Sequence, residues 1–153
     1  MRKRFIEQEV KAQKTEHDWL NLVRIAQAEL SSEDEAHPFE NALEPGGNGW
    51  LAAEAGKQTL RLFFDKPQKL SHIRLTFYEN TQERTQEFLL RWYADDQGHD
   101  IARQQYNFSS PNSTLEVEDF KLDLQNVSAL ELCITPNISG GEARASLAEW
   151  QVA

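Results

Sequence analysis

A polar segment after Tyr78 holds the residue types best suited to recognising a ligand. Residues 79–85 include Glu79, Asn80 and Arg84 and no apolar side chain. A sugar presents several hydroxyl groups, and carboxylates, planar amides and the guanidinium fork of Arg can each bond two oxygens at once. These residues are therefore candidates for a sugar site. A solvated hairpin tip would have the same composition, so both interpretations stay open.

A second candidate is the segment Arg103–Ser109, where amides alternate with aromatic residues. Gln105, Tyr106 and Asn107 could bind a sugar by stacking its apolar face on the ring and hydrogen bonding its edge. One stacked ring at about 1 kcal/mol and two or three hydrogen bonds at about 1 kcal/mol each predict only about millimolar affinity. The alternative is that Tyr106 and Phe108 are core residues of a strand.

Arg144 completes the set of candidate ligand-binding residues. It lies in a loop, residues 139–146, that we expect near the same end of the fold. If the site is functional, Asn80, Arg84, Tyr106 and Arg144 should converge on one concave surface.

Catalytic motifs find no support in the sequence. Cys133 lies between Leu132 and Ile134, where a buried and inert thiol is the norm. The four His residues lack metal-ligand spacing, and no nucleophile elbow, phosphate-binding loop or zinc-protease motif occurs. We predict a protein that is not an enzyme and has no catalytic cofactor.

The elements that would position these residues are strands. Apolar side chains recur every second residue in several runs, and turn residues such as Asp65-Lys66-Pro67 separate those runs. Two packed antiparallel sheets are the simplest way to bury so many one-sided strands. The sequence therefore predicts an all-β sandwich. The alternating runs centre on Leu60–Phe64, Ile73–Phe77, Phe88–Trp92, Phe120–Leu124, Leu130–Ile134 and Leu147–Val152.

The N-terminal part reads differently. Helical spacing predicts a helix from about Lys3 to about Glu16, so residues 1–18 form a helical extension and residues 19–153 the sandwich. We expect a first strand over Arg24–Leu30, then a short helical turn within Ser31–Glu35 that Pro38 ends. Four Trp residues have expected structural roles. Trp50 and Trp92 should pack in the core, and Trp19 and Trp150 should pack together where the chain ends meet.

Composition limits the partners. The 153 residues carry a formal net charge of −9, which disfavours phosphate backbones and predicts that nucleic acid is not a partner. No stretch approaches the roughly 20 apolar residues of a membrane span. With Cys133 as the single cysteine no internal disulfide can form, and we expect a cytoplasmic location.

The order of these elements resembles the discoidin, or coagulation factor 5/8 C-terminal, family and the related galactose-binding-like carbohydrate modules. The resemblance covers about Val23 to Ala153. Its segments are Ala28–Ser32, Gly49-Trp50, Gln58–Leu62, Asp65–Leu75, Phe88–Tyr93 and Ser146–Val152. It implies an antiparallel jelly-roll sandwich that binds sugars, phospholipids or protein surfaces through loops at one end. It also implies that Arg84 and Asn80 contact the sugar.

The resemblance further implies a structural calcium ion between the Gly-rich loop and Glu149, with Glu44 and Asn48 as the nearby oxygen ligands. The usual acidic turn of the family is replaced here by Glu44–Gly49, and the terminal cysteine pair of its extracellular members is missing. The leading hypothesis is a non-enzymatic module that binds carbohydrate weakly through its loops. The alternative is an intracellular protein-interaction module that docks into a larger assembly.

Overall fold

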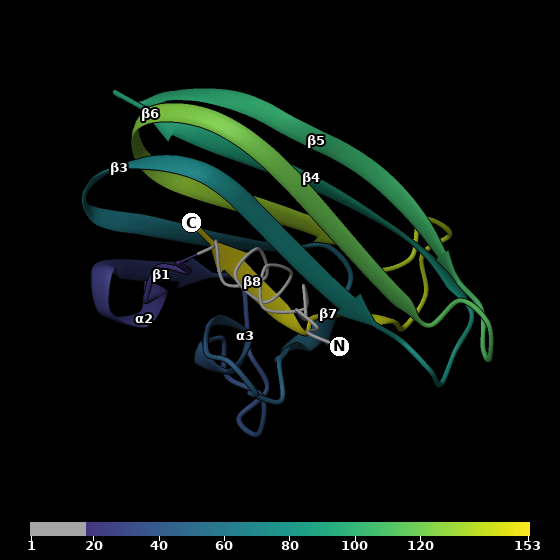
Figure 1. Ribbon diagram of the computed structural model, residues 1–153. Helices are drawn as coiled ribbons and strands as arrows, with labels where there is room; N and C mark the ends of the chain where they lie inside the picture. Colours follow the sequence, from purple (N-terminus) through teal and green to yellow (C-terminus); the bar gives the residue numbers. More distant parts are fainter. Residues whose placement is uncertain (1–17) are drawn as a thin grey trace, which may run out of the picture.

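The chain folds into two facing layers of antiparallel strands, as a computed structural model shows for residues 18–153 (Figure 1). The helix expected between Lys3 and Glu16 lies outside these described residues. The elements are α2 (Leu22–Ile25), β1 (Ala26–Leu30), α3 (Glu40–Leu43), β2 (Trp50–Ala55), β3 (Gln58–Tyr78), β4 (Arg84–Ala94), β5 (Gln97–Phe108), β6 (Leu115–Thr135), β7 (Arg144–Leu147) and β8 (Glu149–Val152).

Strands β3 and β6 run through both layers. Each is 21 residues long and bends over near its middle, where the register between them shifts (Figure 1). β3 and β6 pair along both halves. Residues 58–63 of β3 and 129–134 of β6 lie in a layer with the order β1-β3-β6-β4-β5. Residues 72–78 of β3 and 115–121 of β6 form the second layer together with β8, which pairs with β3 at Leu75↔Trp150. Strands β2 and β7 form a separate small sheet. The predicted all-β sandwich is confirmed.

The core lies between the layers and follows the predicted alternation. Leu60, Leu62 and Leu90 from one layer and Leu75 from the other are fully buried. Phe88 stacks on Phe77 of the opposite layer, with ring centroids 5.4 Å apart. Each such side chain contributes about 2 kcal/mol through removal from water. Trp50 is fully buried, as expected of a core residue, whereas Trp92 is only partly buried against the core; Trp150 is fully buried as well.

Two local predictions before β2 were wrong. The expected strand over Arg24–Leu30 begins with the helical turn α2, so β1 starts only at Ala26. The helical turn expected within Ser31–Glu35 is instead α3, which begins after Pro38. Phe39 and Ala42 of this turn are buried, and Phe39 contacts Trp150. Tertiary packing therefore decides where the turn forms, and Pro38, expected to end a turn, precedes one instead.

Candidate functional site

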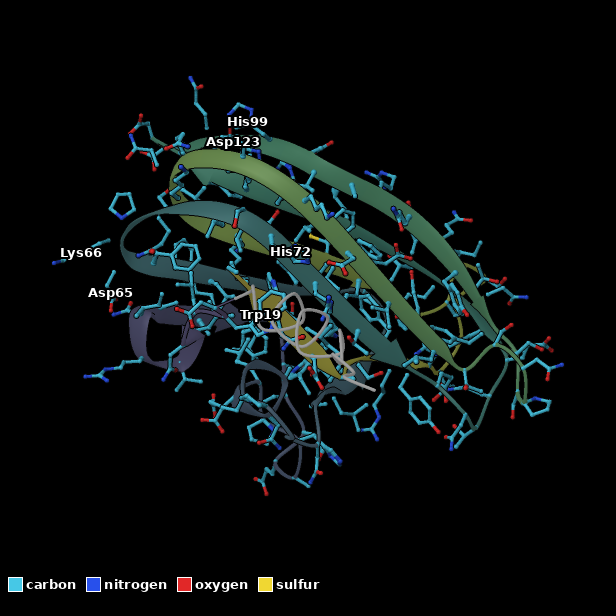
Figure 2. The ribbon with its side chains drawn as sticks, viewed as in Figure 1. Trp19, Asp65, Lys66, His72, His99 and Asp123 are labelled. Atoms are coloured by element: carbon cyan, nitrogen blue, oxygen red, sulfur yellow. The ribbon has the colours of Figure 1, made fainter. Side chains whose placement is uncertain are left out.

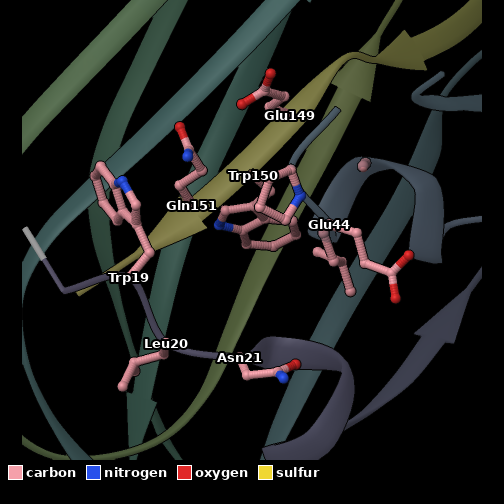
Figure 3. A pocket seen from close by; sticks show the side chains of 10 residues that line it. Trp19, Leu20, Asn21, Glu44, Glu149, Trp150 and Gln151 are labelled. Carbon is pink, nitrogen blue, oxygen red and sulfur yellow. The ribbon is translucent and has the colours of Figure 1, made fainter. Parts of the chain in front are cut away.

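A pocket of about 390 Å³ opens where the N-terminal end of the described chain meets the C-terminal strand. Three segments form it: the stretch before α2, the end of α3 with the residues that follow it, and β8. Figure 3 shows Trp19 and Gln151 on one side of Trp150 and Glu44 on the other. The lining residues are Trp19, Leu20, Asn21, Ala42, Leu43, Glu44, Pro45, Glu149, Trp150 and Gln151.

Trp19 is held in place by contacts on the outer face of β3. The backbone N–H of Leu20 donates to the carbonyl of Val152 at 2.7 Å, which ties this segment to β8. The Trp19 ring meets His72 edge-on at 5.3 Å between centroids, and the two labelled side chains lie together in Figure 2. The guanidinium of Arg74 lies 5.3 Å from the centre of the same ring. Such cation–π contacts favour a fixed ring orientation.

Asp119 anchors both partners of Trp19. It accepts a hydrogen bond of 2.9 Å from Arg74 Nη2 and another from His72 Nε2. Partial burial of Asp119 acts to raise the pKa of its carboxyl, but the Arg74 hydrogen bond and the nearby His72 outweigh burial and lower it. The ring of Trp19 therefore packs against two side chains, His72 and Arg74, that are both hydrogen bonded to Asp119.

Trp150 contributes a buried donor. The side chain is fully buried and contacts Phe39 at 6.1 Å between ring centroids. Its indole Nε1 has no hydrogen-bond partner within residues 18–153. An unpaired buried N–H costs about 1–3 kcal/mol, so most buried Trp side chains do have an acceptor. Trp150 is also one of the residues that line the pocket.

The remaining polar side chains of the pocket supply complementary groups. Asn21 and Gln151 carry amides that both donate and accept, and Glu44 and Glu149 carry carboxylates that accept. Together with the partly exposed ring of Trp19, the pocket offers an apolar platform surrounded by hydrogen-bonding groups. This arrangement suits a small, hydroxyl-rich ring compound.

Two of the three residues expected to bind calcium lie in the same pocket. Glu44 and Glu149 line the pocket together, whereas Asn48 is exposed and is not part of its lining. Calcium prefers six to eight oxygen ligands, with several carboxylates among them. Within residues 18–153 no group of three or more His, Cys, Asp or Glu side chains is arranged to hold a metal ion. The residues present therefore do not fit a calcium site.

Arg84, expected in a solvated loop, is the first residue of β4, and its side chain is 1% exposed. Its Nε donates to Oε1 of Glu79 at 2.8 Å, and its Nη1 donates to the carbonyl of Pro136 at 2.8 Å. Its guanidinium also lies 4.8 Å from the ring centre of Phe108. Arg84 thus joins the β3–β4 loop, the β6–β7 loop and the end of β5 rather than facing solvent.

The β5 candidates point to opposite sides of their strand. Tyr106 turns inward, contacts Phe108 at 4.9 Å between centroids and donates from its hydroxyl to the carbonyl of Leu115 at 3.0 Å. Gln105 and Asn107 are exposed on the other face. Phe108 is fully buried, which supports the core interpretation of this strand. A strand's period of two separates neighbouring side chains, so these three cannot form one surface.

The seven predicted ligand-binding residues do not share a hollow. Asn80 is exposed at the loop, and Arg144 donates to Asp34 Oδ2 at 3.4 Å and to the Ala52 carbonyl at 3.2 Å. The structure brings Glu79 and Arg84 together, but none of the seven lines the pocket described above or the two hollows below. In β4 and β5, inward and outward side chains alternate. Had this alternation been followed as far as Arg84 and Tyr106, it would have placed both side chains on the inward face.

Two other hollows lie on the outer face of the five-stranded layer. One, of about 480 Å³, contains Phe63 and Tyr93 beside Arg61 and Glu131, and Arg61 Nε donates to Glu131 Oε2 at 2.6 Å. The other holds about 50 Å³ and includes Cys133, which is partly rather than fully buried. Among the described residues no helix has the length and apolar character needed to cross a membrane.

Asn21 and Gln151 escaped prediction, and Trp19 and Trp150 were expected only to pack. The two Trp residues near opposite ends of residues 19–153 were the available signal. Segments that meet on one face can leave a gap between them, and the pocket between Trp19 and Trp150 is visible only in the folded structure (Figure 3).

Comparison with known proteins places the fold. No family model matches the sequence, and no curated protein matches it. Solved structures do match. The family 32 carbohydrate-binding module of NanJ from C. perfringens, in complex with galactose, superposes with a TM-score of 0.65 and 17% identity. That match covers 88% of this chain and 96% of the module.

Two further structures match over similar lengths. The family 32 module of AlyQ, in complex with 4,5-unsaturated mannuronic acid, has a TM-score of 0.61 and 16% identity, with 90% of this chain and 98% of that one covered. A pectin-binding carbohydrate-binding module has a TM-score of 0.61 and 17% identity, with 84% and 90% covered. At these identities the matches establish a shared fold, the galactose-binding-like jelly-roll sandwich expected from the resemblance.

Proposed function

We propose that this protein is a non-enzymatic carbohydrate-binding module whose ligand enters the pocket between Trp19 and Trp150. The observation that carries the proposal is the buried indole N–H of Trp150, which lines a pocket and has no acceptor within the described residues. A sugar hydroxyl would accept from it, while the ring of Trp19 would stack on the apolar face of the sugar.

Two lines of support agree. The pocket combines aromatic, amide and carboxylate groups in a volume of about 390 Å³, within the range of small-molecule sites. The fold is shared with modules solved in complex with galactose and with an unsaturated mannuronic acid. Fold alone does not decide function, so the pocket carries the argument and the likeness adds to it.

The loop end of the sandwich is a second place where the same function could reside. Asn80, Gln105, Asn107 and Arg144 are exposed there or beside it. Arg84 would then act as a positioning residue, since it holds two of the loops together through Glu79 and Pro136.

The test is a titration of the full chain with a panel of mono- and disaccharides, followed by amide chemical shifts. Sugar-induced shifts should concentrate on residues 19–21, 42–45 and 149–151. Trp19→Ala should weaken binding at least fivefold through loss of the stacking platform, about 1 kcal/mol. Trp150→Phe, which keeps a smaller aromatic ring and removes the N–H, should do the same through loss of one hydrogen bond.

The matched control is Phe63→Ala, which removes an aromatic ring that is 38% exposed on the other layer. Its binding should equal that of the parent chain. Shifts confined to residues 79–83, 105–107 and 144 would move the site to the loop end. Absence of binding to the whole panel would contradict the proposal and favour the protein-interaction alternative.

A further inference from the structure

Charge distinguishes the Trp19–Trp150 pocket from the other two hollows. Glu44 and Glu149 are part of its lining, and among residues 18–153 no Lys, Arg or His lines it. The 480 Å³ hollow on the outer face combines Arg61 with Asp96 and Glu131, and the 50 Å³ hollow combines Lys57 and Arg103 with Glu87. In both of those hollows a cation accompanies the carboxylates, whereas the described lining of the Trp19–Trp150 pocket has carboxylates alone.

Nearby cations do not cancel this charge. Arg74 approaches Trp19, but its Nη2 is hydrogen bonded to Asp119 at 2.9 Å on the outer face of β3. The chain as a whole carries a formal charge of −9, so the long-range field has the same sign as the pocket. An anionic sugar would meet two carboxylates with no compensating cation among the described lining residues, which costs binding energy for each charge.

We propose that the pocket prefers a sugar bearing a free, protonated amine, a 2-amino-2-deoxyhexose or its oligomers, over neutral and uronic sugars. This inference rests on the proposed function and names the ligand class of the same site. The ammonium group would donate to Glu44 or Glu149, a sugar hydroxyl would accept from Trp150, and the ring face would stack on Trp19.

Each part of such a ligand matches a separate feature of the pocket. An ammonium group has three donors and no acceptor, so it needs carboxylates or carbonyls around it. Stacking and the indole hydrogen bond would serve any pyranose alike, whereas the carboxylates alone distinguish an amine from an N-acetyl group or a hydroxyl. Selectivity and affinity therefore depend on different residues and can be measured apart.

The experiment compares glucosamine, N-acetylglucosamine, glucose and glucuronic acid, and their β-linked dimers, at about pH 6, where an amine with a pKa near 8 is protonated. We expect the order amine, then neutral and N-acetylated, then acidic sugar. Glu44→Gln and Glu149→Gln should each lower affinity for the amine two- to fivefold, as for partly exposed ion pairs. Glucose affinity should fall less than amine affinity in both variants. Added salt should reduce the amine preference.

Three outcomes would overturn the inference and leave the proposed function standing. One is equal or tighter binding of N-acetylglucosamine in the same pocket. Another is that Glu44→Gln and Glu149→Gln both keep the full preference for the amine, although Trp19→Ala abolishes binding and so confirms the pocket as the site. The third is occupation of Glu44 and Glu149 by Ca²⁺ at millimolar concentration with loss of the preference. Failure of all four sugars to shift any pocket residue would instead remove the proposed function.

Gln27→Ala, an exposed amide on β1, serves as the control for general surface effects. It should bind every sugar as the parent does. A thermal unfolding scan of each Gln variant checks that folding is intact, since both side chains lie at the pocket surface rather than in the core.

Discussion

The guanidinium of Arg84 and the carboxylate of Glu79 form an ion pair of 2.8 Å whose side chains are 1% and 12% exposed. The two residues are five positions apart, and they link the start of β4 to the loop that precedes it. The same guanidinium reaches the Pro136 carbonyl and Phe108, so one side chain holds segments more than 20 residues apart. Two loops at this end of the sandwich, and the end of β5, depend on it.

Replacement of Arg84 should therefore be costly. Arg84→Ala leaves the Glu79 carboxylate and the Pro136 carbonyl without their donor, and breaking such a buried pair costs about 3–5 kcal/mol. Arg84→Lys keeps the charge but loses the fork, so a smaller loss is expected. Urea unfolding of both variants measures this. A loss below about 1 kcal/mol for Arg84→Ala would show that the ion pair does not hold the loops.

Acid should weaken the same contact. Burial acts to raise the pKa of Glu79, but hydrogen bonds from Arg84 and Thr81 more than offset burial and hold that pKa below its usual value of 4.5. A group whose folded-state pKa is lowered adds stability above its unfolded pKa and loses it as pH falls. Glu79→Gln should then reduce the loss of stability below about pH 4.5. Urea midpoints measured from pH 7 to pH 3 test this, with Glu142→Gln on an exposed loop as the control.

Glu116 should give the opposite pH dependence. It faces the space between the layers near Gln86, and burial, reinforced by its hydrogen bond to Glu118, raises its pKa to about 8. Between its usual value of 4.5 and about 8 the folded chain holds a proton that the unfolded chain releases. Stability should therefore fall as pH rises through that window, by at most about 1.4 kcal/mol per pH unit.

Glu116→Gln stays neutral at every pH and should remove that slope. At pH 8–9 we expect the variant to have a higher melting temperature than the parent, by about 3 °C for each kcal/mol gained. At pH 5 the two melting temperatures should be nearly equal. Thermal unfolding from pH 5 to pH 9 measures the difference. Parallel curves for parent and variant across that range would mean that Glu116 is already ionised in the folded chain.

Glycines of the loop before β2 offer a matched pair of variants. Gly46 and Gly49 both have positive φ angles, +73° and +81°, which disfavour any residue with a Cβ. At Gly46 nothing lies within 4 Å of an added Cβ, whereas at Gly49 it would lie 2.9 Å from the Leu147 carbonyl oxygen.

Gly46→Ala should therefore cost about 1 kcal/mol, the price of the left-handed conformation alone. Gly49→Ala should cost more, because the loop must also move away from Leu147, and it should disturb the pocket through Glu44 and Pro45. Urea unfolding compares the two variants, and sugar titration follows the pocket. Equal costs would show that the close approach to Leu147 is easily relaxed.

The order and type of most strands followed from the sequence alone. Alternation at Leu60–Phe64, Phe88–Trp92 and Leu130–Ile134 assigns one face of each strand to the core, because a period of two sends neighbouring side chains to opposite sides. Those inward residues are the buried ones in the structure. Turn residues such as Asp65-Lys66-Pro67 marked where the chain changes layer. They did not show that β3 continues through the bend.

The site depended on tertiary structure. Arg84 is buried rather than exposed to solvent because it contacts Pro136 and Phe108, which lie 52 and 24 positions away in the sequence. The composition of the segment around Arg84 contains no information about these contacts. The pocket likewise joins Trp19 to Trp150 across 131 positions of sequence. Periodicity reports the face on which a side chain lies. The distance between two faces, and hence whether a gap between them is filled, is set only when the layers pack.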